Sequence, residues 1–411
     1  WDVDYLRDNR DENMGFLSKT LLPDGTEIPG TNFDYNYLQH RKVDVVSSAL
    51  DFILPFEKYK ITAGAKVSFT NTRNGINYDT SDPTLVQDDY FRYKEQIYAL
   101  YADYSREYSE RFSMQLGLRM EHTRTTGISE AKDTEDKHDY TRLFPTVYLL
   151  YSPTDGHALN FSFSNRISRP SQNMVNPFPF YQNKYTYACG REDLKPSYTY
   201  NAELGYTLKN NFNVSAYYSY SDDVFFQVVD LDAETNVTSF LWENFMQTHA
   251  FGLNNSYTFR TKWLQAYAQH GVSYRRTTSS AATTSPEEKG WAYDASLRNT
   301  FFFNEKKTLL ATLSGSYSSR QYQGIYLMSP TYSVSAGMLY RLLDNKLNLS
   351  LNVNNLFVSH SKLETMSNGL KIIADNQFSF TSFRIGVSYT FGGDIRSKGQ
   401  RNSNEDIQRR L

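Results

Sequence analysis

The chain has 411 residues and a formal net charge of −2, so its size suits one large domain and no overall field steers it towards nucleic acid. Its mean hydropathy is negative, and no run approaches the ~18 apolar residues that a membrane-spanning helix requires. Aromatic residues make up 16% of the chain, an excess that suits the interfacial girdles of a β-barrel with a polar lumen.

The first region of the chain, residues 1–40, is expected to hold one strand and an outer loop. Residues 1–10 supply the strand, and 11–39 form the loop, in which Pro23-Asp24-Gly25 makes a turn. Trp1-Asp2-Val3-Asp4 is already polar, so no export signal is visible. We therefore interpret the chain as a processed product or as a piece of a longer protein.

Residues 41–391 show an alternation of apolar and polar residues that is typical of strands. The clearest segments are 112–121, 159–164, 198–208 and 347–354. Most approach or exceed the roughly ten residues of a tilted strand that crosses a bilayer, whereas soluble strands average about five or six. The pattern predicts an all-β fold, a transmembrane antiparallel up-and-down β-barrel. About 15–16 strands lie in this chain, and membership of a larger barrel stays open.

The connections between these segments alternate between short turns and longer polar stretches. The short turns lie near 55–58, 108–111, 153–157, 209–211, 260–263, 304–307 and 344–346. The longer stretches are 74–90, 127–138, 169–197, 231–238, 279–289, 322–330 and 361–376. Outer-membrane barrels have short periplasmic turns and long external loops, so this order favours such a barrel over a soluble meander.

The longest internal connection, 169–197, is the strongest candidate for solute contact. It holds aromatic rings beside amides, which suit stacking and hydrogen bonding to sugars or peptides. The residues concerned are Asn176, Phe178, Phe180, Tyr181, Tyr185 and Tyr187. Alternatively, the rings pack the loop over the barrel mouth.

Three charged residues, Arg166, Arg169 and Glu203, are expected at or near the lumen face, because a charge on the lipid face is costly. They line a solute path in one interpretation. In the other, they form a structural charge network across neighbouring strands.

No pattern for catalysis or cofactor binding is visible in the sequence. The seven His residues have no metal-site spacing, there is no nucleophile elbow and no phosphate-binding glycine loop, and we expect no enzyme activity. Asp222-Asp223 with His249 is better explained as a pair of rim carboxylates in water. The acidic residues of 130–136 are better explained as a solvated loop than as a metal site. The single cysteine, Cys189, cannot form an internal disulfide.

The last strand and the tail complete the chain. Phe383, Ile385, Val387, Tyr389 and Phe391 fall on one face of a strand, whereas Arg384, Gly386, Ser388 and Thr390 fall on the other. The tail from 392 to 411 is rich in charged and small polar residues and is expected to be a solvated periplasmic extension.

Three segments carry a resemblance to a known family. Arg384, Gly386, Tyr389 and Phe391 resemble the closing-strand assembly signal of bacterial outer-membrane barrels. The stretch from Arg166-Ile167-Ser168-Arg169-Pro170 through Leu194-Lys195-Pro196 to Glu203-Leu204-Gly205 resembles the barrel of TonB-dependent receptors, with Arg191 where Asn is usual. Asn352-Val353-Asn354-Asn355-Leu356-Phe357 resembles an element near the end of such barrels. The likeness is greatest to the outer-membrane β-barrel family abundant in Bacteroidetes.

The resemblance implies a function in the cell outer membrane: transport, as the barrel portion of a TonB-dependent nutrient receptor. It implies contact with outer-membrane lipid, with the barrel-assembly machinery and with TonB through an N-terminal plug region that nothing in 1–40 resembles. A surface lipoprotein is a further candidate partner; nucleic acid is not. Two alternatives stay open, a structural or assembly subunit of an envelope complex and a passive porin.

Overall fold

The computed structural model describes residues 1–81, 88–376, 380–391, 407 and 410. The first half of the chain forms β1 (Asp2–Ser18), β2 (Phe33–Pro55), β3 (Lys60–Thr80), β4 (Asp89–Ser109), β5 (Phe112–Ser129), β6 (Thr134–Tyr151), β7 (His157–Ser168), α1 (Gln172–Val175), β8 (Pro179–Asn183), β9 (Thr186–Cys189) and β10 (Ser197–Leu208). The second half forms β11 (Phe212–Asp232), β12 (Val237–Arg260), β13 (Leu264–Ser279), β14 (Glu287–Phe302), β15 (Leu309–Ser318), β16 (Gln321–Gln323), β17 (Tyr326–Met328), β18 (Thr331–Leu342), β19 (Leu347–Val358), β20 (Ser361–Ser367), β21 (Leu370–Asn376) and β22 (Ser382–Tyr389).

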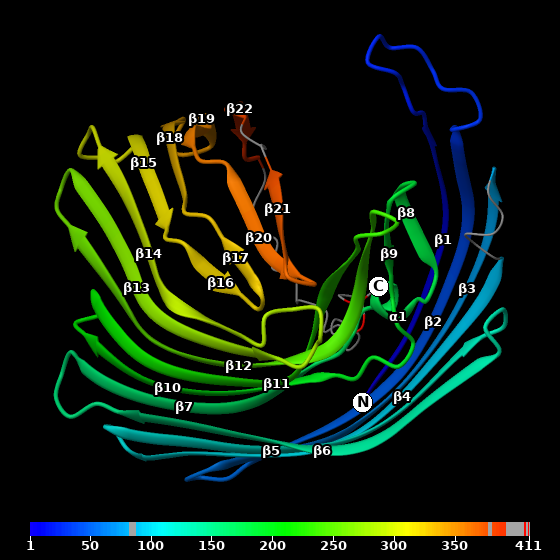
Figure 1. The fold of residues 1–411 in the computed structure, drawn as a ribbon. Coiled ribbons are helices and arrows are strands. Elements are labelled where there is room, and N and C mark those ends of the chain that lie inside the picture. Colours follow the sequence, from blue (N-terminus) through cyan, green and yellow to red (C-terminus); the bar gives the residue numbers. More distant parts are fainter. Residues whose placement is uncertain (82–87, 377–379, 392–406, 408–409, 411) are drawn as a thin grey trace.

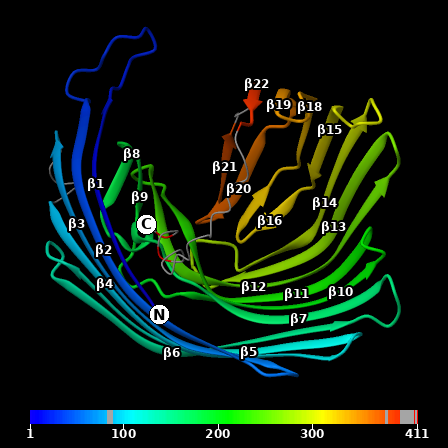
Figure 2. The same cartoon turned by 180° about the vertical axis from the view of Figure 1, so that it is seen from behind.

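The main sheet has 18 strands, and all of them except β8 and β9 form one antiparallel up-and-down meander. This confirms the predicted fold class. The meander curves into a trough that is open along one side (Figures 1 and 2). Among the described residues, β1 pairs only with β2 and β22 pairs only with β19, so these two strands are the free edges of the sheet.

The two faces of the sheet differ in chemistry. On the convex face, large apolar side chains are exposed in a continuous band, for example Leu118 (50% exposed) on β5 and Leu204 (56% exposed) on β10. On the concave face, the strands present polar side chains such as Thr70, Thr123 and Ser215, which are buried. An exposed apolar band of this extent is unstable in water, whereas lipid covers it without cost. The convex face is therefore the lipid face.

The seven short turns lie where the sequence predicts them. The connection between β10 and β11 is a three-residue turn, 209–211, in which Asn211 N–H donates to the carbonyl of Leu208 at 3.1 Å. Lys209 and Asn210 both have positive φ, 49° and 56°, which is the type I′ turn that matches strand twist.

Two of the expected long connections are short, which corrects the prediction for 127–138 and 231–238. The ladder between β5 and β6 continues to Ser129 and Thr134, and the ladder between β11 and β12 continues to Asp232 and Val237. The ends of β5 and β6 carry mainly polar residues on both faces, whereas the ends of β11 and β12 carry apolar residues such as Val228 and Val229 that are buried in a separate cluster. The alternation therefore disappears from the sequence although the backbone pairing continues.

The outer connections that contain β8, β9, β16, β17, β20 and β21 fold towards the concave side (Figure 1). β16, β17, β20 and β21 form a second, four-stranded sheet from two such connections. β9 pairs in parallel with β12, and β8 pairs with β9. In the described part of the chain, no helix is long and apolar enough to cross a membrane.

At the N-terminus, β1 reaches Ser18, so the outer loop is 19–32 and is shorter than the expected 11–39. The expected turn is present, because Gly25 N–H donates to the carbonyl of Leu22 at 2.8 Å. Most of the predicted periplasmic tail, 392–406, lies outside the described residues. Ile407 is described and is 1% exposed, so it is buried and not solvated.

The closing strand β22 pairs with β19 in the register that its sequence requires. Ser350 lies opposite Gly386, where a Cβ would stand 2.6 Å from the Ser350 hydroxyl oxygen, so the glycine makes room for that side chain. Tyr389 (55% exposed) and Phe391 (86% exposed) are open on the lipid side.

Replacing Tyr389 and Phe391 together by Ser is expected to abolish assembly into the outer membrane, because the lipid face of the closing strand then ends in hydroxyls. The measurement is the fraction of folded, heat-modifiable protein in outer-membrane fractions. The matched control is Ser388→Ala with Thr390→Ser, which changes the opposite face and should assemble normally. Normal assembly of the Tyr389/Phe391 variant would contradict the assignment of an assembly signal.

Candidate functional site: the concave wall

The loop 169–196 is fixed at both ends of its path across the concave side. On one side, Thr186–Cys189 adds a parallel ladder to β12, and Lys195 N–H donates to the Asn244 side-chain oxygen at 2.8 Å. Arg191 extends this attachment, since it pairs with Asp193 at 2.7 Å and with Glu243 of β12 at 2.9 Å. The side-chain hydrogen bonds from Arg191 hold the pKa of Asp193 below its usual value. Arg191 thus holds the loop to β12 through ion pairs.

The turn around Gly190 explains one of the motif residues. Gly190 N–H donates to the carbonyl of Asn176 at 3.0 Å, and Arg191 N–H donates to the carbonyl of Met174 at 2.8 Å. A Cβ on Gly190 would lie 2.2 Å from the Asn176 carbonyl oxygen. Only glycine permits this close approach of two backbone segments.

On its other side, the loop packs into an aromatic cluster at the outer ends of β2, β3 and β4. The buried members are Phe33, Tyr35, Tyr37, Ile76, Phe91, Tyr93, Val175, Phe178, Tyr181 and Leu194. Tyr35 and Tyr78 both donate to the carbonyl of Pro179, at 3.0 and 3.2 Å. The cluster therefore combines apolar burial with hydroxyls that satisfy the loop backbone.

The aromatic candidates of this loop have different environments. Phe178 (2% exposed) and Tyr181 (6% exposed) belong to the cluster, as the packing alternative requires. Phe180 and Tyr187 are half-buried against the cluster, and Tyr185 is 49% exposed. Asn176 is 2% exposed; its side-chain oxygen accepts from Phe178 N–H at 3.3 Å. Of the six residues, Tyr185 is thus the one that presents most of its ring for contact.

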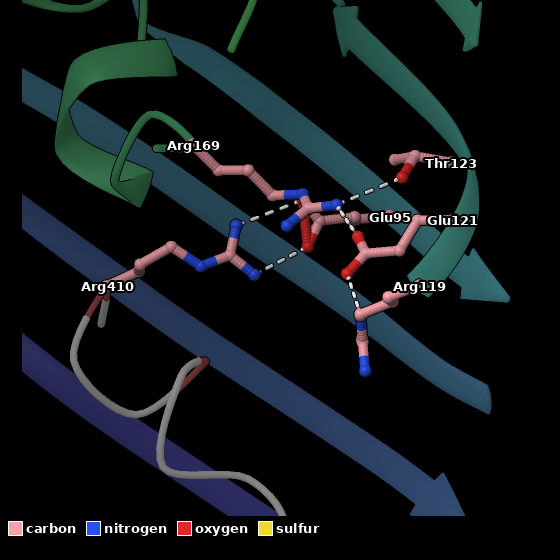
Figure 3. A network of polar contacts seen from close by, with 6 residues as sticks. All are labelled: Glu95, Arg119, Glu121, Thr123, Arg169 and Arg410. Atoms are coloured by element: carbon pink, nitrogen blue, oxygen red, sulfur yellow. Dashed lines mark hydrogen bonds and ion pairs between the residues drawn. The ribbon is translucent and has the colours of Figure 1, made fainter. Parts of the chain in front are cut away.

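A buried charge network crosses the concave wall at the start of this loop (Figure 3). Arg169 donates to one carboxylate oxygen of Glu121 at 2.5 Å and to the Thr123 hydroxyl at 3.2 Å. Arg119 donates to the other carboxylate oxygen of Glu121 at 2.5 Å. The side chains of Arg169 and Glu121 are only 11% and 8% exposed. Arg169 therefore joins the loop to β5 as part of a structural charge network.

The other two charged candidates lie apart from this network. Arg166 on β7 is exposed and lies opposite Thr199, whereas Glu203 lies four residues further along β10, opposite Ser162. Among the described residues, neither forms an ion pair. Arg166 contributes to a hollow of about 470 Å³ in the concave wall, together with Tyr101, Asp103, Arg119 and Glu121.

Arg119 and Glu121 were not singled out from the sequence as site residues, although the alternation along β5 places both on its polar face. Both alternate with the apolar residues of β5 and therefore share the concave face with Ser113 and Gln115. A charge of either sign in the middle of a membrane strand is costly unless it faces inward and has a partner.

The described residues hold no cluster of three or more His, Cys, Asp or Glu side chains that is arranged to bind a metal ion. His249 hydrogen-bonds the Tyr218 hydroxyl at 2.8 Å, while Asp222 accepts from Gln247 at 2.9 Å. Cys189 donates to the carbonyl of Pro177 at 3.1 Å, and burial raises the pKa of its thiol. These groups are engaged in local structure.

Together, the meander, its lipid face and its polar, loop-covered concave face define the wall of an outer-membrane β-barrel. The family described as the outer membrane protein beta-barrel family matches residues 1–389. The chain belongs to this family and is an outer-membrane protein. No curated protein matches it.

Solved structures with the same fold are proteins named for uptake and transport. The chain is similar to the ferric yersiniabactin uptake receptor FyuA from Yersinia pestis (TM-score 0.60, 15% identity, covering 95% of this chain and 59% of that one). It is also similar to the copper transporter OprC (TM-score 0.61, 12% identity, covering 94% of this chain and 66% of that one). A third similar structure is the ferric citrate transporter FecA (TM-score 0.58, 12% identity, covering 94% of this chain and 62% of that one). The chain spans about half to two thirds of their lengths, and at these identities the likeness shows the fold.

Replacing Glu121 by Gln is expected to lower the free energy of unfolding by about 3 kcal/mol, because it removes the counter-charge of the buried Arg169 guanidinium and of the half-buried Arg119. The measurement is urea-induced unfolding in lipid vesicles. The matched control is Glu130→Gln, which removes an exposed pair with Arg92 (3.2 Å) and should cost about 1 kcal/mol or less. Equal effects of the two substitutions would contradict a buried network at Glu121.

Proposed function

We propose that this chain is the C-terminal part of the barrel of a TonB-dependent receptor that imports a bulky nutrient across the outer membrane. The observation that carries the proposal is the inward folding of the outer connections onto a polar concave wall. A wall that only had to span the membrane would not need the loop 169–196 or the second sheet on its concave side. Such loops suit capture of a solute before it enters the lumen.

The open edges of the sheet support a larger barrel. In lipid, every backbone N–H and C=O group needs a partner, so the free edges of β1 and β22 require further strands. The similar transporters are longer than this chain and share its fold. We propose that strands and a plug outside this chain complete the lumen and that TonB acts through that region.

The remaining proposed partners follow from particular surfaces. The barrel-assembly machinery would recognise the closing strand, and a surface lipoprotein would cover the outer connections. For the solute, the exposed ring of Tyr185, in the same loop as the half-buried Phe180 and Tyr187, suits stacking against a sugar or peptide. Arg166, Glu203 and the 470 Å³ hollow then contribute polar contacts along the path.

A structural role in an envelope complex is the second candidate, and one observation favours it. The aromatic cluster and the charge network fill much of the concave side over β2 to β5, as in a rigid scaffold. The two functions differ in whether solute uptake depends on the protein.

The test is uptake of candidate glycans and peptides by a deletion strain, complemented with the complete gene, in backgrounds with and without TonB. Active import predicts that uptake of one solute is lost on deletion and without TonB. Tyr185→Ala should reduce that uptake without lowering stability, whereas Phe178→Ala should destabilise the protein by about 3–5 kcal/mol. Unchanged uptake of every solute after deletion would refute import and leave the scaffold role; uptake independent of TonB would indicate a passive porin.

A further inference from the structure

Two described residues near the C-terminus, Ile407 and Arg410, lie against the concave wall. The guanidinium of Arg410 donates two hydrogen bonds to the carboxylate of Glu95 on β4, at 2.7 and 3.0 Å (Figure 3). The Glu95 side chain is 3% exposed and that of Arg410 is 15% exposed. A buried carboxylate on a barrel wall is costly, and the bidentate ion pair with the Arg410 guanidinium compensates for the burial of Glu95.

Ile407 occupies a separate apolar position on the same wall. It packs against Val43 and Val45 of β2, both 0% exposed, and against Leu6 of β1. The concave face of β2 is otherwise covered near its outer end by the aromatic cluster. Val43 and Val45 therefore form an apolar patch beneath that cluster, and Ile407 covers it.

Backbone contacts fix the spacing between the two side chains. Arg410 N–H donates to the carbonyl of Ile407 at 2.9 Å, and Gln172 N–H of α1 donates to the carbonyl of Arg410 at 3.2 Å. Gln172 is itself held on β3, since the Thr72 hydroxyl donates to its side-chain oxygen at 2.9 Å. The loop 169–196 thus supplies one wall of the position that Arg410 occupies.

We propose that the concave wall carries a binding site for a peptide segment with an aliphatic residue followed, three positions later, by an arginine, and that the chain's own Ile407 and Arg410 occupy it. The site has three parts: the valine patch of β2, the Glu95 carboxylate of β4 and the Gln172 amide of α1. The inference does not depend on transport, since it rests on contacts between Ile407 or Arg410 and residues of β2, β4 and α1.

The chemistry of the site selects arginine over lysine. A planar guanidinium donates to both oxygens of a carboxylate at once, whereas an ammonium presents a single point charge. Arg169 lies close enough for its charge to attract that of Glu95, but it hydrogen-bonds Glu121 and Thr123, whereas both guanidinium N–H donors to Glu95 shown in Figure 3 come from Arg410. The aliphatic patch sets the register of the bound segment.

The first test is digestion of the folded full-length protein from its C-terminus with carboxypeptidase Y, followed by intact mass. While Arg410 is bound to Glu95, it is protected from the carboxypeptidase. Hydrogen bonds to charged groups contribute about 1.5–3 kcal/mol, so the release of Arg410 should be at least about tenfold faster in Glu95→Gln. Ile407→Asp, which leaves the wall unchanged, should give the same acceleration. Glu130→Gln is the matched control and should behave as the wild type. Equal release of Arg410 from all four proteins would overturn the proposal.

The second test asks whether the wall binds the segment in trans. Full-length Arg410→Glu, in which the native occupant is repelled, is titrated against a fluorescent peptide with the sequence of residues 405–411. Saturable anisotropy is expected, and it should be lost with the peptide that carries R410E and with the double variant Glu95→Gln/Arg410→Glu. Absence of saturable binding to Arg410→Glu would refute the site.

Discussion

The requirement that every backbone polar group in lipid has a partner governs this structure. The chain meets it with long antiparallel strands whose ladders continue past the membrane, as between β5 and β6. The period-two alternation follows, because one face of each strand contacts lipid while the other faces the concave side. The same requirement means that the free edges of β1 and β22 need partners in the membrane, and our proposal supplies them with further strands.

The concave side is organised by a second constraint, the cost of burying polar groups without partners. Glu121 is tolerated there because two guanidinium groups, those of Arg119 and Arg169, donate to it. Arg169 in turn has Glu121 and the Thr123 hydroxyl as partners, and the loop 169–196 reaches the wall through these contacts. Glu95 is satisfied in a similar way by Arg410. The aromatic cluster adds apolar burial around these networks, so the loop and the strands pack together on the concave side, with Ile407 and Arg410 against the same wall.

The short turns and the long strands were predictable from the sequence, because the residues that determine them are close together in the chain. Turn residues such as Lys209 and Asn210 and the alternation along 198–208 depend only on neighbouring positions. The pairing of the polar ends of β5 and β6 was not predictable, since both faces there carry mainly polar residues and no hydrophobic alternation remains. The contacts of Arg410 with Glu95, and of Phe178 with Phe91, join positions far apart in the chain. Only the folded sheet brings them together.

The central claim is that the convex face lies in lipid and the concave face in water. It is tested most directly by single-cysteine scanning along β10 in membranes, in a Cys189→Ser background. The account predicts that cysteines at 202 and 204 react with a lipid-soluble maleimide, and that those at 201 and 203 react with a water-soluble one. Reactivity without this alternation, or with the two reagents exchanged, would contradict it.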